Sequence, residues 1–235
     1  MLTASEESAQ PRVPVWGYED LAVFLGAVLP SLAVALGAVR LCKKFAPQTF
    51  LSVGFTQTVF QCIFYLLLMG VLRIILDWKY QAPFWRSLGC TFDFRNAWQF
   101  LGLGPVLSIT LGSLTVFLRP PVTESPIEDL ILDRRALILV LLLGPMVEEL
   151  VFRGFLFPLL ARSLGPWPGV IATAIPFALL HGVQNEWTWQ LLVPIGLAGV
   201  VFGAVRQVTG STVAAMLVHV GYNSTAVALY LFQKG

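Results

Sequence analysis

A chain of 235 residues in which 57% are hydrophobic and only 12% are charged is too apolar for a soluble domain, which carries about 25% charged residues. Its mean hydropathy of +0.77 and its repeated apolar runs of roughly 20 residues predict an integral, multi-pass membrane protein. The net charge of +2 is spread over the chain without a basic cluster, so nucleic acid is not an expected partner.

The first twenty residues are polar and precede the first apolar run. They contain four acids and one arginine, whereas a signal peptide begins with a basic segment. We therefore expect the first apolar run to be retained as a helix. The predicted organisation is a polar tail, residues 1–20, followed by a single transmembrane helical domain, residues 21–235.

Seven apolar segments are predicted to cross the membrane, with six or eight as alternatives, which gives an all-α polytopic bundle. In chain order they are residues 21–39, 50–76, 97–118, 136–160, 166–180, 189–205 and 211–232. The stretch between the second and third segments mixes aromatic and charged residues, a pattern typical of chain at a membrane interface, and could hold a short re-entrant helix. Lysine and arginine divide evenly between alternate loops, so no orientation is predicted.

Three charges, Glu148, Glu149 and Arg153, lie inside the fourth predicted span. At 1.5 Å per residue Glu148 is about 18 Å along a hydrocarbon core of roughly 30 Å, where three uncompensated charges would cost on the order of 8–10 kcal/mol. Spacing of four residues lets Glu149 and Arg153 pair on one face, whereas Glu148 points elsewhere and is the candidate for chemistry. Gly144 and Pro145 favour a kink that would admit water to Glu148.

Both histidines of the chain, His181 and His219, fall in or at the end of apolar segments. Asn223 follows His219 by one helical turn, and Phe177 precedes His181 by one turn, where its ring can orient the imidazole. Taken singly, each histidine is more often an interhelical hydrogen-bonding residue. Together with Glu148 they form a hydrolytic set, because a carboxylate can take a proton from water while His219 and Asn223 donate to an oxyanion. We expect all of these side chains to line one polar cavity within the membrane.

Three motifs, EELVFR, FALLH and HVGYN, follow one another on successive apolar regions. As EExxxR, FxxxH and HxxxN they resemble the motifs of the CPBP family of intramembrane proteases, which contains the type II CAAX prenyl endopeptidases and the bacteriocin-processing or immunity (Abi) proteins. The resemblance covers residues 145–223, roughly a third of the chain. The corresponding catalytic core is placed at about residues 136–232.

The resemblance implies an intramembrane endopeptidase and a role for each matching residue. Glu148 would activate the attacking water with help from His181, and His219 with Asn223 would stabilise the oxyanion. Glu149 and Arg153 match the first motif too, and their spacing of four residues gives them the role of a supporting ion pair. Substrates would be membrane-associated peptides or proteins of the prenylated CAAX type or the bacteriocin or leader type.

Two other functions fit the same residues. A non-catalytic immunity or scaffold protein could share the fold, and an ion-coupled transporter would also bury carboxylates and histidines. The chain has no internal repeat, so a transporter built from two matching halves gains no support. The expected partners are a membrane-associated substrate and the lipid bilayer, and no oligomeric state is predicted.

No cofactor is favoured, although zinc remains an alternative. Glu148, His181 and His219 could supply a His₂Glu zinc site. They come from three separate helices, however, without the compact spacing of four residues between histidines that usually anchors such sites. The three cysteines are far apart and outside any CxxC pair, so they predict neither disulfides nor a thiolate metal site. Metal-independent hydrolysis is therefore favoured.

Overall fold

The computed structural model describes residues 14–50, 52–121 and 134–234, and its regular structure over these ranges is helical. The long helices are α1 (Tyr18–Phe45), α2 (Val53–Arg73), α4 (Ala97–Leu118), α10 (Trp189–Thr209) and α11 (Thr212–Lys234). A helical run links α6 (Arg134–Ile138), η4 (Leu139–Leu143), α7 (Gly144–Glu149), η5 (Leu150–Leu156) and α8 (Phe157–Leu164). The shorter elements are η1 (Pro47–Phe50), η2 (Ile74–Lys79), α3 (Phe84–Ser87), η3 (Phe94–Asn96), α9 (Pro166–Leu180) and η6 (Val183–Asn185).

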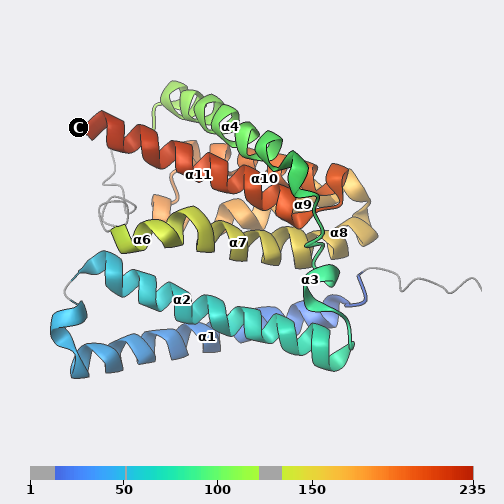
Figure 1. Ribbon diagram of the computed structural model, residues 1–235, viewed down its shortest axis with the longest axis horizontal. Helices are drawn as coiled ribbons and strands as arrows, with labels where there is room; N and C mark the ends of the chain where they lie inside the picture. Colours follow the sequence, from blue (N-terminus) through green and yellow to red (C-terminus); the bar gives the residue numbers. More distant parts are fainter. Residues whose placement is uncertain (1–13, 51, 122–133, 235) are drawn as a thin grey trace, which may run out of the picture.

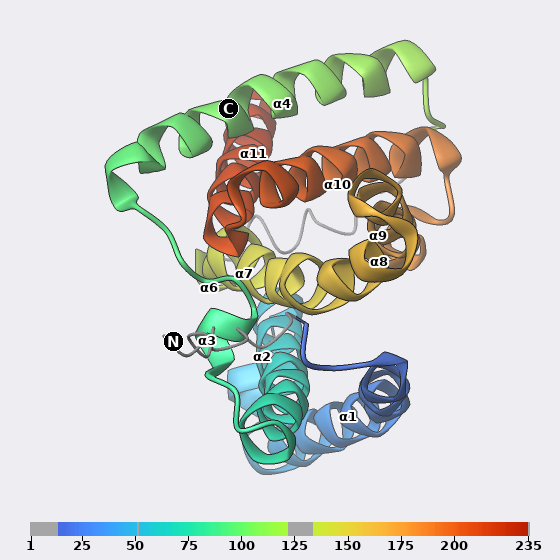
Figure 2. The same ribbon diagram turned by 90° about the vertical axis from the view of Figure 1, so that its right-hand side faces the viewer.

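The helices form three layers, and the run from α6 to α8 is the middle layer (Figure 1). On one side of this run lie α1 and α2, which pack against each other, and on the other side lie α4, α10 and α11 (Figure 2). Helix α9 packs against both α8 and α10. The run is therefore the central element on which the rest of the bundle assembles.

The predicted all-α polytopic bundle is confirmed. Among the described residues, five helices are long and apolar enough to cross a membrane: α1, α2 with η2, η3 with α4, α10 and α11. The predicted segment 166–180 is the shorter apolar helix α9, and segment 136–160 is the run from α6 to α8. The hydropathy pattern thus locates each helix because apolar length is what a membrane span requires.

The end of the predicted polar tail is packed against the bundle rather than free. Helix α1 already begins at Tyr18, and Trp16 and Asp20 are both only 1% exposed. The Trp16 ring stacks on Phe155 with centroids 5.3 Å apart, and its Nε1 donates to the Phe155 carbonyl at 3.0 Å. Asp20 accepts from Lys79 Nζ at 2.6 Å. Helix α1 thus includes the last three residues of the predicted tail, and residues 1–13 lie outside the described part.

The stretch expected to lie at the membrane interface contains a short α-helix, α3, and the 3₁₀ helix η3, and between them the chain turns inward. Leu88 is fully buried, and its carbonyl accepts from the Thr212 hydroxyl at 2.5 Å. The Thr212 amide donates to the Gly89 carbonyl at 2.9 Å. Trp78 and Trp85 remain exposed, as expected for interfacial rings. The loop after α3 thus docks on the first residue of α11.

Two hydrophobic clusters meet at the π-helical segment η5. The first joins α1, α2 and the loop after α3, and η5 adds Leu150 and Phe155 to it. The second joins α4, α9, α10 and α11, and η5 adds Phe152. Residues of this one segment therefore pack against α1 and α2 as well as against α4, α9, α10 and α11.

Helices α4 and α11 approach each other at a pair of glycines. A Cβ atom added to Gly104 would lie 2.5 Å from the Gly221 carbonyl carbon, and one added to Gly221 would lie 2.5 Å from the Leu101 carbonyl oxygen. Both obstacles are backbone atoms, which cannot rotate away. The absence of side chains here sets the distance between α4 and the helix that carries His219.

Replacing Gly104 by alanine should therefore destabilise the bundle, by about 1–3 kcal/mol for a steric clash in a packed region. The measurement is thermal unfolding of the purified protein in detergent. Gly112→Ala on the same helix is the matched control, because nothing lies within 4 Å of its added Cβ. There the better helix propensity of alanine should leave stability equal or slightly raised. Equal melting temperatures for the two variants would contradict the close approach.

Candidate functional site

The hydrogen-bond register of the central run changes on both sides of its two glutamates. The Gly144 amide donates to the Leu139 carbonyl, five residues earlier, which closes the π-helical segment η4. Pro145 has no N–H to continue an α-helical ladder at this point. The kink expected at this glycine and proline is thus accommodated by a π segment, and a second one, η5, follows α7. Glu148 and Glu149 lie on the six residues of α7 between them, and π segments of this kind often occur at functional sites.

Glu149 and Arg153 form a buried ion pair, as their spacing of four residues predicts. Neither side chain is exposed, and Arg153 Nη1 donates to Glu149 Oε1 at 2.9 Å. Nη2 donates to the Gly199 carbonyl of α10 at 2.7 Å. The guanidinium carbon lies 4.5, 5.4 and 5.9 Å from the ring centroids of Phe177, Phe202 and Phe152. One carboxylate, one carbonyl and three aromatic faces together compensate the buried cation.

The imidazole of His219 lies between the two glutamates. Its Nδ1 is 3.0 Å from Glu149 Oε1, and its Nε2 is 4.0 Å from Glu148 Oε2. The ring stacks on Phe202 with centroids 4.5 Å apart. Because the carboxylate of Glu149 can only accept, Nδ1 carries the proton and donates. In the neutral imidazole Nε2 is then an acceptor facing Glu148.

His181 is held in the same manner by a backbone carbonyl. It caps the end of α9, where its amide donates to Ala178, three residues earlier, instead of closing an α-turn. The Phe177 carbonyl is therefore available to His181 Nδ1 at 2.9 Å, and the two rings pack with centroids 5.0 Å apart. Asn185 Nδ2 donates to the His181 carbonyl at 2.8 Å and fixes the turn. Phe177 thus orients His181 through its carbonyl as well as its ring.

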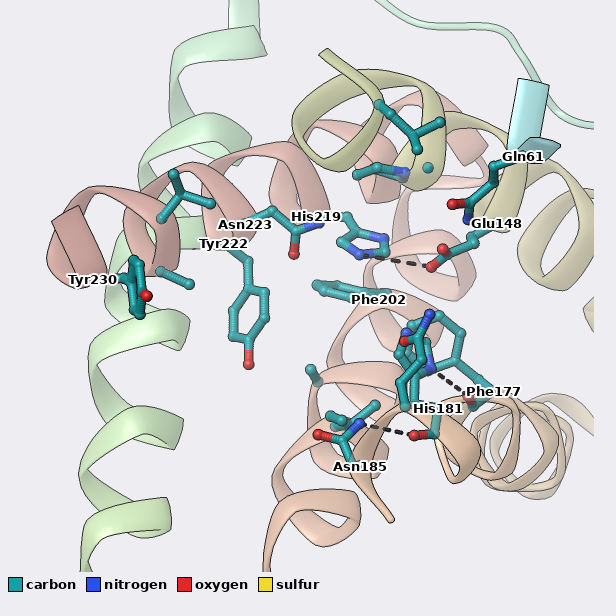
Figure 3. A pocket seen from close by; sticks show the side chains of 18 of the residues that line it. Gln61, Glu148, Phe177, His181, Asn185, Phe202, His219, Tyr222, Asn223 and Tyr230 are labelled. Carbon is teal, nitrogen blue, oxygen red and sulfur yellow. Dashed lines mark hydrogen bonds and ion pairs between the residues drawn. The ribbon is translucent and has the colours of Figure 1, made fainter. Parts of the chain in front are cut away.

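One cavity of about 370 Å³ brings the expected residues together (Figure 3). Glu148, His181, His219 and Asn223 all line it, together with Phe177. The Glu148 side chain is 25% exposed, in contrast to the fully buried Glu149. Apolar residues of η4, α10 and α11 complete the wall: Leu139, Ile195, Ala198, Ala226 and Val227. The arrangement places a carboxylate and two imidazoles beside a space large enough for water and part of a peptide.

A comparison with protein-family models agrees with the motifs. The model described as type II CAAX prenyl endopeptidase Rce1-like matches residues 132–225. Residues 132–225 are thus similar to this family, and we call them the Rce1-like domain. This domain lies within the CPBP and CAAX protease family and contains all three motifs, and the family points to a CAAX-type intramembrane endopeptidase in general terms. Searches among curated proteins and among solved structures give no match.

The Rce1-like domain covers less than half of the chain. It contains the whole central run together with α9, α10 and the first part of α11, whereas α1 to α4 lie outside it. The match to a membrane-protease family, together with the five helices long and apolar enough to cross a membrane among the described residues, identifies the protein as an integral multi-pass membrane protein.

Two cavity residues from outside the Rce1-like domain did not emerge from the sequence analysis. Tyr65 of α2 lies beside Glu148, since a Cβ atom added to Gly144 would be 3.9 Å from the Tyr65 hydroxyl and 3.7 Å from Glu148 Oε1. Gln61 Nε2 donates to the Tyr65 hydroxyl at 2.7 Å. The spacing of four residues between Gln61 and Tyr65 in a mainly apolar span is the signal that could have found them. Other polar lining residues that the sequence analysis did not single out are Gln184, Asn185, Tyr222 and Tyr230.

The residues of the Rce1-like domain do not fit a tetrahedral zinc site as they stand. Ligands at about 2.0–2.2 Å from one zinc ion would lie about 3.4 Å apart. Glu148 Oε2 and His219 Nε2 are 4.0 Å apart. Within the described parts of the chain, no three histidine, cysteine, aspartate or glutamate side chains are grouped so that they could hold a metal ion. We therefore derive no catalytic step through a metal.

Arg153→Met should lower both the yield of folded protein and its stability, because Glu149 would remain buried without its cation. The expected loss is about 3–5 kcal/mol, the range for breaking one half of a buried pair. Recovery after size-exclusion chromatography and thermal unfolding in detergent measure it. Arg95→Met is the matched control, since Arg95 pairs with Asp93 while 89% exposed, and an exposed pair contributes little. Similar behaviour of the two variants would mean that the buried pair is dispensable for folding.

Proposed function

We propose that the protein is an intramembrane endopeptidase that hydrolyses peptide bonds of membrane-associated substrates with water activated by Glu148. The observation that carries the proposal is the pair formed by Glu148 Oε2 and His219 Nε2, 4.0 Å apart at the edge of the cavity. This separation is too long for a direct hydrogen bond. A single water molecule can contact both atoms, and both can accept its protons.

The proposed reaction adds water across the peptide bond in two steps. Glu148 takes a proton from water while the water oxygen attacks the carbonyl carbon, which leaves a tetrahedral oxyanion. Glu148 then returns the proton to the departing amine nitrogen, and the carbon–nitrogen bond breaks. The carboxylate is thereby restored to its initial charge, and no other reactant is consumed.

The tautomer of His219 favours a role different from the one expected from the motifs. There His219 was to stabilise the oxyanion with Asn223, whereas here we assign it to the attacking water. Because Nδ1 donates to Glu149, neutral His219 accepts at Nε2 and positions the attacking water. The amide of Asn223, one turn along α11, is then the donor proposed for the oxyanion. His181 also uses Nδ1 internally, so its Nε2 is a second acceptor, for the water or for a substrate N–H.

The proposed substrates are peptides anchored in or on the membrane. The Rce1-like domain supports the CAAX type in general, and the apolar wall of the cavity suits a substrate with apolar residues beside the cleaved bond. Prenylated CAAX proteins and bacteriocin or leader peptides both have this character. Two synthetic substrates that differ only in the prenyl group would separate them.

Glu148→Gln should abolish turnover while leaving the fold intact, because the amide cannot take a proton from water. A loss of about 10²–10⁴-fold is expected for a general base. The assay uses protein in liposomes with fluorogenic peptides of one sequence, farnesylated or carrying an apolar transmembrane anchor. Glu186→Gln is the control, since Glu186 is exposed in the turn after α9. Wild-type turnover by Glu148→Gln would refute the base assignment, and ion flux without cleavage would favour a transporter.

Removal of metal should leave cleavage unchanged, since no proposed step uses a metal ion. Activity and metal content are measured on one purified sample before and after dialysis against EDTA and 1,10-phenanthroline. Unchanged turnover in metal-free protein is expected. Stoichiometric zinc, with activity lost on chelation and restored by zinc alone, would overturn the metal-independent mechanism.

A further inference from the structure

We infer that Tyr65, held in place by Gln61, is a positioning residue for Glu148 and that helix α2 therefore completes the active site from outside the Rce1-like domain. The inference rests on the proposed function, since it concerns the same carboxylate. Gln61 lies beside Glu148 at the cavity in Figure 3. Both α2 residues line that cavity.

The direction of the hydrogen bonds follows from the chemistry of the three side chains. Gln61 Nε2 donates to the Tyr65 hydroxyl oxygen at 2.7 Å, so the lone pairs of that oxygen are engaged on one side. A phenol has a single proton, and an ionised carboxylate can only accept. With its oxygen accepting from Gln61, the Tyr65 hydroxyl has its proton available for the neighbouring Glu148 carboxylate, and we assign this donation to it. The chain of donors runs from the Gln61 amide through the Tyr65 phenol to the Glu148 carboxylate.

The two oxygens of Glu148 are directed to different neighbours. Oε2 faces His219 Nε2. Oε1 lies beside Gly144, since a Cβ atom added there would be 3.7 Å from Oε1 and 3.9 Å from the Tyr65 hydroxyl. The phenol oxygen and Oε1 thus both lie within 4 Å of one point beside Gly144. With one oxygen on the Tyr65 side, the other is aimed at the place proposed for the water.

The neighbouring Tyr65 hydroxyl would hold the Glu148 side chain in a fixed position. Its side chain is a quarter exposed, and a glutamate with several rotatable bonds would sample many positions in an open cavity. A hydrogen bond donated to the carboxylate restricts these positions and favours the ionised form that acts as a base. Tyr65 therefore acts through Glu148 without contacting the reacting atoms.

The test compares Tyr65→Phe with Tyr18→Phe in the liposome assay. Tyr18 also loses a hydrogen-bonded hydroxyl, but its partner is Ser163 on the exterior, at 2.7 Å. Tyr65→Phe should lower kcat by about tenfold or more, the effect of one hydrogen bond to a charged group, with KM within about twofold of wild type. The acidic limb of kcat/KM against pH should move to higher pH, because the carboxylate loses a donor that favours its charge. A merely structural role would not move that limb.

Gln61→Leu provides a second reading if Tyr65→Phe folds poorly in thermal unfolding. The Gln61→Leu substitution removes the donor to the Tyr65 hydroxyl but keeps the phenol. The acidic limb of kcat/KM should therefore move in the same direction as in Tyr65→Phe, but by less. A wild-type kcat and pH profile for Tyr65→Phe would overturn the inference, as would a higher KM at unchanged kcat, which would indicate a substrate contact. If Glu148→Gln is inactive while Tyr65→Phe behaves as wild type, only the positioning role fails. Full turnover by Glu148→Gln would remove both proposals.

Discussion

One carboxylate oxygen, Oε1 of Glu149, accepts from both Arg153 and His219, and the rest of the site depends on this shared contact. A buried charge costs several kcal/mol unless it is paired, so these side chains must stay together in the folded state. Arg153 also binds the Gly199 carbonyl, and His219 stacks on Phe202, both on α10. The interaction that neutralises the interior therefore also fixes the imidazole and the direction of its Nε2. Folding and the proposed catalysis therefore depend on the same residue.

The π-helical register of η5 explains how distant parts of the chain are attached to the charged run. Pro158 has no N–H to offer the carbonyl five residues before it, and that carbonyl, of Arg153, accepts from Arg206 Nε at 3.3 Å. The Phe155 carbonyl accepts from Trp16 Nε1 at 3.0 Å. The Arg153 carbonyl, which an α-helical ladder would have used internally, thus holds α10, and the Phe155 carbonyl holds the segment before α1. The local departure from α-helix is what makes the run a central element.

The sequence predicts those features that are local in the chain. Apolar length locates the helices, and segments 97–118 and 166–180 coincide with α4 and α9 because a polar residue or a helix-breaking proline or glycine borders them. The Glu149–Arg153 pair follows from a spacing of four residues. The contact of His219 with Glu149 spans 70 residues, and no spacing rule reaches that far. The π segments have no hydropathy signature, and the buried Trp16 lies in a stretch whose composition is polar.

The different surroundings of the two adjacent glutamates bear on the reaction itself. Glu149 has a cation, a second donor and no exposure, so it has no room for a water molecule. Glu148 forms no ion pair with lysine or arginine within the described ranges, and it lies on a cavity of about 370 Å³. An ionised carboxylate in a medium of low dielectric constant needs hydrogen-bond donors. In the proposed mechanism Tyr65 supplies one, and water is the remaining donor that the cavity can admit. The need of a carboxylate for donors would then also bring the reacting water to Glu148.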